Sequence, residues 1–204
     1  MEAPDIPALL QEAQASGAPV MRGTLTEGAA VDPLLCQFAP LLIVGGGHVG
    51  RALAQAASAV DFAVTVADDR PEFASSENIP WARRVLCQPL DGIVAAAGPD
   101  AGTFVVICTR GHLYDTRCTE QALRSDAPYV GVIASRRKRG MILEHLRERG
   151  FSDERLAALR MPVGLSIGAE TPEEIAVSVV AELIQERRSP GVQDATAASL
   201  RSES

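Results

Sequence analysis

Short apolar runs alternate with Ala-rich, helix-period segments from residue 41 onward. The apolar runs, rich in β-branched residues, predict strands at 41–44, 62–67, 84–87, 103–108 and 129–133. The segments between and after them predict helices at 48–59, 89–97, 114–125, 136–149, 153–159 and 172–187. Alternating strands and helices are typical of a parallel sheet covered on both faces. We therefore predict an α/β fold, a Rossmann-like doubly wound parallel sheet in three αβα layers.

The two ends of the chain lack this pattern. Residues 1–40 carry scattered Pro and Gly and predict one short helix, at 7–16, so we interpret them as a leader. Residues 189–204 are rich in Ser and Ala and predict a flexible tail. The Rossmann-like domain is thus expected at 41–188.

The last predicted helix has a distinct start. Thr171 stands at the N-cap, Pro172 at the first helical position and Glu174 at the third, which is a capping box combined with an N1 proline. Its apolar residues suit packing on a sheet, so a structural role explains this helix.

Charge and composition exclude several classes of protein. The formal net charge of −7 argues against nucleic-acid binding through a broad basic surface. No apolar run approaches the roughly 18 residues of a membrane span, and no signal peptide is visible, so a cytoplasmic location is expected. The cysteines lie too far apart for zinc-site spacing and are expected to be free thiols: Cys36, Cys87, Cys108 and Cys118.

A glycine-rich turn follows the first predicted strand and opens the first helix. The spacing of Gly45, Gly47 and Gly50 fits the GxGxxG pattern in its strand–turn–helix context. In that pattern the first glycine permits the tight turn, the second lets a pyrophosphate approach, and the third allows close helix packing. We predict a nucleotide-type site at Gly45, Gly46, Gly47, His48, Val49 and Gly50. The alternative is a Rossmann fold that keeps these glycines for packing only.

The second predicted strand runs into Asp68, Asp69 and Arg70, about twenty residues past the glycines. A carboxylate at that place can accept a ribose hydroxyl of a dinucleotide. Arg70 could instead meet a 2′-phosphate, which leaves NAD and NADP both open.

Polar residues also follow the fourth and fifth predicted strands. Thr109, Arg110, Gly111 and His112 should lie where doubly wound sheets bind ligands, although His112 could merely cap a helix or face solvent. Ser135 marks a predicted helix start, and Arg136 and Arg137 after it begin a run of four cations where the helix dipole favours anions. An anionic ligand or an acidic partner would compensate them, or they simply face solvent.

Cys108 ends the fourth strand and is the thiol best placed for sulfur chemistry. Arg110 nearby could favour its thiolate. A buried small apolar side chain is the alternative, and it is the one that we favour for all four cysteines.

Taken in order, these motifs and the segment 162–176 resemble the XdhC/CoxI family of xanthine dehydrogenase accessory factors, over residues 31–188. The run from Gly168 to Glu174 is the most family-specific part. The resemblance implies a helper protein that binds molybdenum cofactor (molybdopterin), supports its sulfuration and delivers it to a molybdenum hydroxylase such as xanthine or carbon monoxide dehydrogenase. It further implies a cysteine desulfurase as a second partner and makes a homodimer plausible.

Two departures accompany the resemblance. Family members usually carry a separate domain ahead of the Rossmann half, whereas about forty residues precede the first strand here. Ala134 stands where the family more often has glycine. Two other functions stay open on the residues: an NAD(P)-dependent oxidoreductase, which would lack an evident Tyr-x-x-x-Lys pair, and a nucleotide-binding regulatory module.

Overall fold

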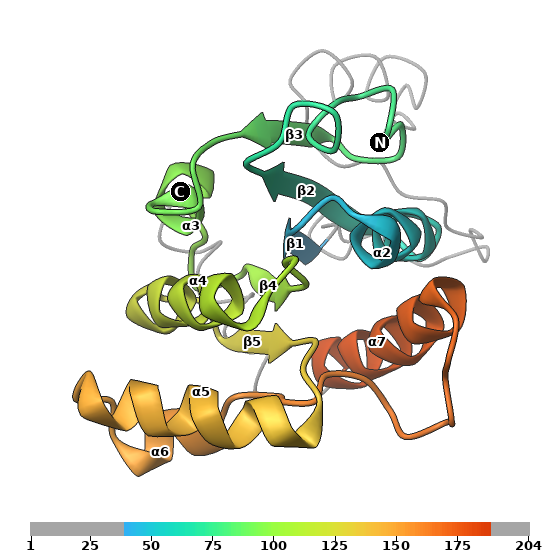
Figure 1. Cartoon of the computed structure of the whole chain (residues 1–204). Helices are drawn as coiled ribbons and strands as arrows, with labels where there is room; N and C mark the ends of the chain where they lie inside the picture. The colour runs from blue at the N-terminus through green and yellow to red at the C-terminus, as the bar shows by residue number, and fades with distance from the viewer. Residues whose placement is uncertain (1–38, 189–204) are drawn as a thin grey trace, which may run out of the picture. The chain divides into compact units, whose positions relative to one another are not determined.

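The computed structural model describes residues 39–188, and the predicted α/β fold is confirmed there. Five parallel strands form one sheet in the order β3-β2-β1-β4-β5. Their bounds are β1 Ala39–Val44, β2 Phe62–Asp68, β3 Arg84–Cys87, β4 Phe104–Ile107 and β5 Tyr129–Val132. Figure 1 shows this order running from β3 to β5.

Within residues 39–188, six helices cover the two faces of the sheet. They are α2 His48–Ser58, α3 Ile93–Ala97, α4 His112–Arg124, α5 Arg136–Glu148, α6 Asp153–Ala157 and α7 Pro172–Arg187. Helices α2 and α7 pack on one face, and α3 to α6 contribute to the core on the other (Figure 1). The three predicted αβα layers are therefore present.

The central strand explains why the sequence shows continuous apolar runs. In β1, Leu41 and Ile43 point to the α2 and α7 side, while Leu42 and Val44 point to the opposite core. All four side chains are at most 2% exposed. A strand that is covered on both faces needs apolar residues at every position, as parallel sheets generally do.

Two helices begin at other residues than the sequence pattern predicted. Helix α3 begins at Ile93 instead of residue 89, because Gly92 takes a left-handed conformation with φ +95° directly before it. Helix α4 begins at His112 instead of residue 114, with Gly111 extended at its N-cap. In α7 the predicted capping box is confirmed: Thr171 Oγ1 accepts from the Glu174 N–H at 3.2 Å, and Glu174 Oε2 accepts from the Thr171 N–H at 3.0 Å.

Several sequence-based expectations fall on residues outside the described range. These are the leader 1–40, apart from its last two residues, with its helix at 7–16, the thiol of Cys36 and the tail 189–204. The limits of the domain stay a prediction. Among residues 39–188, no helix is long and apolar enough to cross a membrane.

The strand order places the switch point of the sheet between β1 and β4. Beyond β1 the chain first adds β2 and β3 on one side, and then returns to add β4 and β5 on the other. Ligands of doubly wound sheets bind outside the strand ends at such a point. We call this the carboxyl edge and define it by the segments after β1, β2, β4 and β5: 45–47, 69–70, 108–111 and 133–135.

Candidate functional site

Gly45 and Gly50 are glycines because the turn after β1 leaves no room for a side chain. Gly45 has φ +116° and donates its N–H to the Ala67 carbonyl at 2.8 Å. A Cβ on Gly45 would lie 2.5 Å from the Cys108 carbonyl oxygen, and a Cβ on Gly50 would overlap the Gly45 carbonyl oxygen. The tight turn and the close approach of α2 both depend on these two residues.

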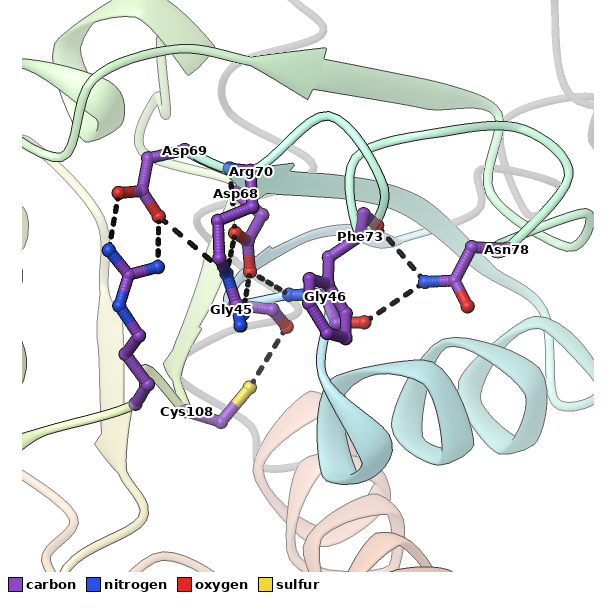
Figure 2. A network of polar contacts seen from close by, with 9 residues as sticks. Gly45, Gly46, Asp68, Asp69, Arg70, Phe73, Asn78 and Cys108 are labelled. Atoms are coloured by element: carbon purple, nitrogen blue, oxygen red, sulfur yellow. Dashed lines mark hydrogen bonds and ion pairs between the residues drawn. The ribbon is translucent and has the colours of Figure 1, made fainter.

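The carboxylate of Asp68 holds the glycine turn through hydrogen bonds. Its Oδ2 accepts the Gly46 N–H at 2.8 Å and Arg70 Nη2 at 2.9 Å, while its Oδ1 accepts the Arg70 N–H at 3.0 Å and Nε at 2.9 Å (Figure 2). Asp68 is only 2% exposed. Both oxygens are thus engaged within the chain, and binding of a ribose hydroxyl by Asp68 stays a prediction that requires one of these donors to give way.

The same contacts set the charge state of Asp68. Burial acts to raise its pKa, but the hydrogen bonds from the Arg70 side chain and from the Gly46 and Arg70 N–H groups, with the Arg70 charge, outweigh burial. The net pKa is lowered from the ordinary 3.8, and the carboxylate is charged at neutral pH.

The segment after β2 folds back over the glycine turn. The Arg70 guanidinium lies 3.7 Å from the centre of the Phe73 ring, and Asn78 Nδ2 donates to the carbonyls of Gly46 and Phe73 at 3.1 Å each (Figure 2). A Cβ on Gly46 would lie 2.5 Å from the Phe73 carbonyl oxygen, so this glycine serves packing. Sequence reasoning did not find Phe73 or Asn78, because neither belongs to a motif and Asn78 lies 32 residues from Gly46.

Gly47 differs from the other three glycines. It is the N-cap of α2, with φ −67°, and no side chain caps the helix there. Among the described residues, apart from its chain neighbours, no atom lies within 4 Å of the place a Cβ would occupy. Neither backbone conformation nor packing requires a glycine at this position. The space in front of it adjoins the N-terminus of α2, with His48 and Val49 in its first turn.

The loop after β4 crosses to the loop after β2. Arg110 donates Nη1 and Nη2 to the two carboxylate oxygens of Asp69, each at 2.8 Å. Thr109 Oγ1 donates to Asp115 Oδ1 at 2.6 Å, and Gly111 and His112 form the start of α4. The structure thus brings Asp69 and Arg110 together, whereas sequence reasoning had placed them in two separate motifs.

Cys108 lies beneath the glycine turn as a protonated thiol. Its Sγ donates to the Gly45 carbonyl oxygen at 3.3 Å (Figure 2). Burial raises the pKa of this thiol strongly, and the charges of Asp115 and Asp68 raise it further. The expectation that Arg110 favours a thiolate was therefore wrong, since that guanidinium is bound to Asp69. Cys108 is instead a small, partly buried side chain that packs against the core, which is close to the alternative. Cys118 is buried as expected, whereas Cys87 is exposed at the end of the edge strand β3, so the expectation of a buried thiol was wrong for Cys87.

The turn after β5 leads into α5. Ser135 is the N-cap, and its Oγ accepts the Lys138 N–H at 3.3 Å. Arg136 and Arg137 are the first two residues of the helix, whose first turn holds no acidic residue. Lys138 Nζ lies 4.0 Å from Oδ2 of the buried Asp115. The sequence-based prediction did not include Asp115 and Lys138 among the site residues, although Lys138 carried a compositional signal as the only lysine of the chain.

A pocket of about 590 Å³ opens beside Ser135. It lies between the turn 133–135, the loop 162–169 and the start of α7 at Ile175 and Ser178. Glu182 of α7 anchors that loop, since its Oε2 accepts the Gly164 N–H at 3.0 Å and its Oε1 accepts the Tyr129 hydroxyl at 2.5 Å. The loop belongs to the segment 162–176 that resembles the XdhC/CoxI family, and it includes Gly168 and Ala169 of the most family-specific run.

Comparison with known proteins gives consistent matches. The family model described as the XdhC Rossmann domain matches residues 41–183. The chain is 38% identical over 153 residues to the uncharacterized protein YqeB of Escherichia coli K12, covering 74% of this chain and 28% of YqeB. It is 32% identical over 150 residues to a protein of Bacillus subtilis described as a probable subunit of xanthine dehydrogenase, covering 72% of this chain and 43% of the relative.

A solved structure agrees with these matches. A protein described as a xanthine dehydrogenase from Bacillus halodurans superposes with a TM-score of 0.65 at 29% identity, covering 78% of this chain and 47% of the other. The chain thus spans less than half the length of each of these three proteins.

Proposed function

Since the chain belongs to the XdhC family, we propose that it is an accessory factor in the maturation of a molybdenum hydroxylase of the xanthine dehydrogenase type. The Bacillus subtilis and Bacillus halodurans proteins support this, because the names of both refer to xanthine dehydrogenase. The proposed partner is therefore a molybdenum hydroxylase, of the xanthine or carbon monoxide dehydrogenase type.

We further propose that the carboxyl edge binds a phosphate-bearing ligand, which is the molybdenum cofactor or a nucleotide such as NAD(P). Gly47 is the observation that carries this proposal. Gly45, Gly46 and Gly50 are each required by the fold, whereas Gly47 faces open space at the N-terminus of α2. A missing side chain at that place lets a phosphate reach the free N–H groups of the helix.

The residues present fit a phosphate at this place. The first turn of α2 supplies N–H donors, and Arg110 supplies a guanidinium at the crossing of the β2 and β4 loops. The pocket between 133–135 and 162–169 offers room for the body of a ligand. When bound, molybdenum cofactor would bring the metal on a pterin whose phosphate is the anionic group for these donors.

The contacts of Asp68 favour a ligand that is held by phosphate. In dinucleotide sites a carboxylate at the end of the second strand accepts the ribose hydroxyl. Here that carboxylate is engaged by Gly46 and Arg70. Between the candidate ligands, we therefore favour the molybdenum cofactor over NAD(P).

Two finer parts of the proposed role stay predictions. The first is a contribution to sulfuration together with a cysteine desulfurase. The raised pKa of the Cys108 thiol gives no support for a sulfur-carrying role of that residue. The second is the homodimer.

Native mass spectrometry tests the ligand proposal directly. The protein is incubated in parallel with isolated molybdenum cofactor, NAD(H) and NADP(H), and compared with Gly47→Val. A molybdopterin-sized adduct that is lost in Gly47→Val supports the proposal. Gly102→Val is the matched control, because Gly102 lies in the turn before β4, at the other end of the strand.

Other adducts would favour other functions. A dinucleotide adduct alone would move the assignment to a nucleotide-binding regulatory module. Hydride transfer from NAD(P)H to an added acceptor would favour the oxidoreductase. Equal binding by wild type and Gly47→Val would overturn the glycine-turn site.

A further inference from the structure

Lys138 stands out because lysine is otherwise absent from this chain. The chain has nineteen lysines and arginines in total, and Lys138 is its only lysine. Wherever else this chain needs a cation it carries arginine, so a background preference for one residue type does not explain the lysine. A lysine amine differs from a guanidinium in being a compact point charge with three freely oriented donors.

The position of Lys138 adds a second observation. Its Nζ lies 4.0 Å from Oδ2 of Asp115, whose side chain is 1% exposed, while the lysine side chain is 43% exposed. Asp115 belongs to the first turn of α4, and Thr109 donates to its other oxygen at 2.6 Å. The ammonium is therefore held over a buried carboxylate at the carboxyl edge, with one side open to solvent.

The contact with Asp115 differs from the arginine pairs beside it. Arg70 and Arg110 each donate two side-chain hydrogen bonds to a carboxylate, at 2.8 to 2.9 Å. At 4.0 Å, Lys138 makes a longer, purely electrostatic contact. Its donors can therefore reach a hydrogen-bond acceptor on the open side, and the positive charge of the ammonium favours an anion there.

The helix around Lys138 also favours an anion. Lys138 follows Arg136 and Arg137 in the first turn of α5, which holds no acidic residue. The helix dipole disfavours cations at this end of the helix. Asp115 faces the Lys138 ammonium, and a bound oxyanion would add negative charge at this helix start. Ser135, the N-cap of the same helix, lines the pocket described above, so a ligand in that pocket would lie next to the start of α5.

We propose that Lys138 is a ligand-binding residue, which contacts a phosphate or pyrophosphate oxygen of the ligand from the α5 side of the carboxyl edge. This inference rests on the proposed function, because it assumes a phosphate-bearing ligand at that edge. Asp115 acts as a positioning residue that holds the ammonium in place.

The single lysine makes a site-resolved experiment possible. The protein is acetylated with limiting acetic anhydride, with and without pyrophosphate, and the rate at Lys138 is followed by peptide mass spectrometry. The N-terminal amine is the internal control. Saturating pyrophosphate is expected to slow acetylation of Lys138 about fivefold or more, since a bound phosphate blocks the amine, and to leave the N-terminal amine unchanged.

Calorimetry with pyrophosphate separates this inference from the proposed function. Binding that Gly47→Val abolishes, together with protection of Lys138, supports both. Binding that Gly47→Val abolishes without protection of Lys138 overturns the role of Lys138 and leaves the proposed site standing. No binding of pyrophosphate by the wild type contradicts both.

Variants give an independent readout of the same role. Lys138→Met is expected to lower pyrophosphate affinity about tenfold, and Lys138→Arg less, because one charge-assisted contact is lost or displaced. Arg139→Met, the exposed neighbour in α5, is the matched control and should change affinity less than about twofold. Unchanged affinity in Lys138→Met, with an unchanged melting temperature, would refute the assignment.

Discussion

A single carboxylate holds the glycine turn in its conformation. Asp68 accepts hydrogen bonds from the Gly46 N–H and from both the backbone and the side chain of Arg70, although it is almost completely buried. Burying such a charge is favourable only when its hydrogen bonds are satisfied. Asp68 therefore fixes the backbone of the turn that leads to Gly47, the glycine with open space beside it.

We predict that Asp68→Asn lowers the free energy of unfolding by about 1–3 kcal/mol at pH 7, because an amide cannot accept from all of these donors. The pKa of Asp68 is lower in the folded chain than its ordinary 3.8. Its contribution is therefore fully present well above pH 3.8 and is lost as the pH falls through the lower folded pKa. Urea unfolding from about pH 7 down to about pH 2.5 should show the difference between wild type and variant shrinking at the acid end. A constant difference would contradict this account.

Substitution by alanine should change stability in opposite directions at two glycines of this chain. Gly50→Ala would place a Cβ on the Gly45 carbonyl oxygen, so we expect a loss of several kcal/mol or no folded protein. Gly140→Ala lies within α5, where a Cβ meets no atom within 4 Å, and should raise stability by about 0.5–1 kcal/mol. Thermal unfolding of the two variants measures both signs, and a stabilised Gly50→Ala would disprove the packing role.

At the scale of elements, α7 links the sheet to the loop that borders the pocket. Its N-terminus is fixed by the capping box of Thr171 and Glu174, and Glu182 in its interior holds Gly164 of the loop. The buried residues Val179 and Leu183 pack in the same core as β1. Helix α7 therefore fixes the loop 162–169 relative to the sheet.

We expect Thr171→Ala to cost about 1 kcal/mol of stability, because the Glu174 N–H loses its side-chain acceptor. Ser166→Ala is the matched control, since Ser166 is exposed in the loop 162–169 that precedes α7. Its effect on stability should stay within about 0.5 kcal/mol. Chemical denaturation of both variants provides the comparison. Equal effects would mean that the box does not stabilise α7.

For the domain as a whole, ion pairs join separate segments at the carboxyl edge, and one of them connects the two halves of the sheet. Arg110 after β4 binds Asp69 after β2, and Lys138 of α5 faces Asp115 of α4. The Arg110 and Asp69 side chains are 38% and 23% exposed, so water screens this pair and its net contribution to stability is small. An anionic ligand can therefore take Arg110 over from Asp69 at low cost.

Arg110→Gln should change the free energy of unfolding by less than about 1 kcal/mol, as is usual for an exposed pair. If the phosphate site lies at this crossing, the same change should lower pyrophosphate affinity about tenfold. Differential scanning calorimetry and titration calorimetry give the two values. A large loss of stability with unchanged affinity would identify Arg110 as a structural residue instead.

The sequence by itself determined the elements of this domain and their stacking. Strand-sized apolar runs, helix-period segments and the Thr171 box are local patterns, and they predicted the five strands and the bounds of α7 because each is set by neighbouring residues. Boundaries failed where a glycine conformation decided them, as at Gly92 before α3. The turn and packing roles of Gly45 and Gly50 were also predictable, since the strand–turn–helix pattern imposes them.

Only the tertiary structure decided how the polar residues of the carboxyl edge are used. Asp68 and Gly46 are 22 residues apart, and Arg110 and Asp69 are 41 apart. No local pattern states whether a carboxylate at a strand end faces a ligand, a backbone N–H or an arginine from another loop. The segments after β1, β2, β4 and β5 meet only when the sheet has formed, and the contacts of Asp68, Asn78 and Lys138 follow from that meeting.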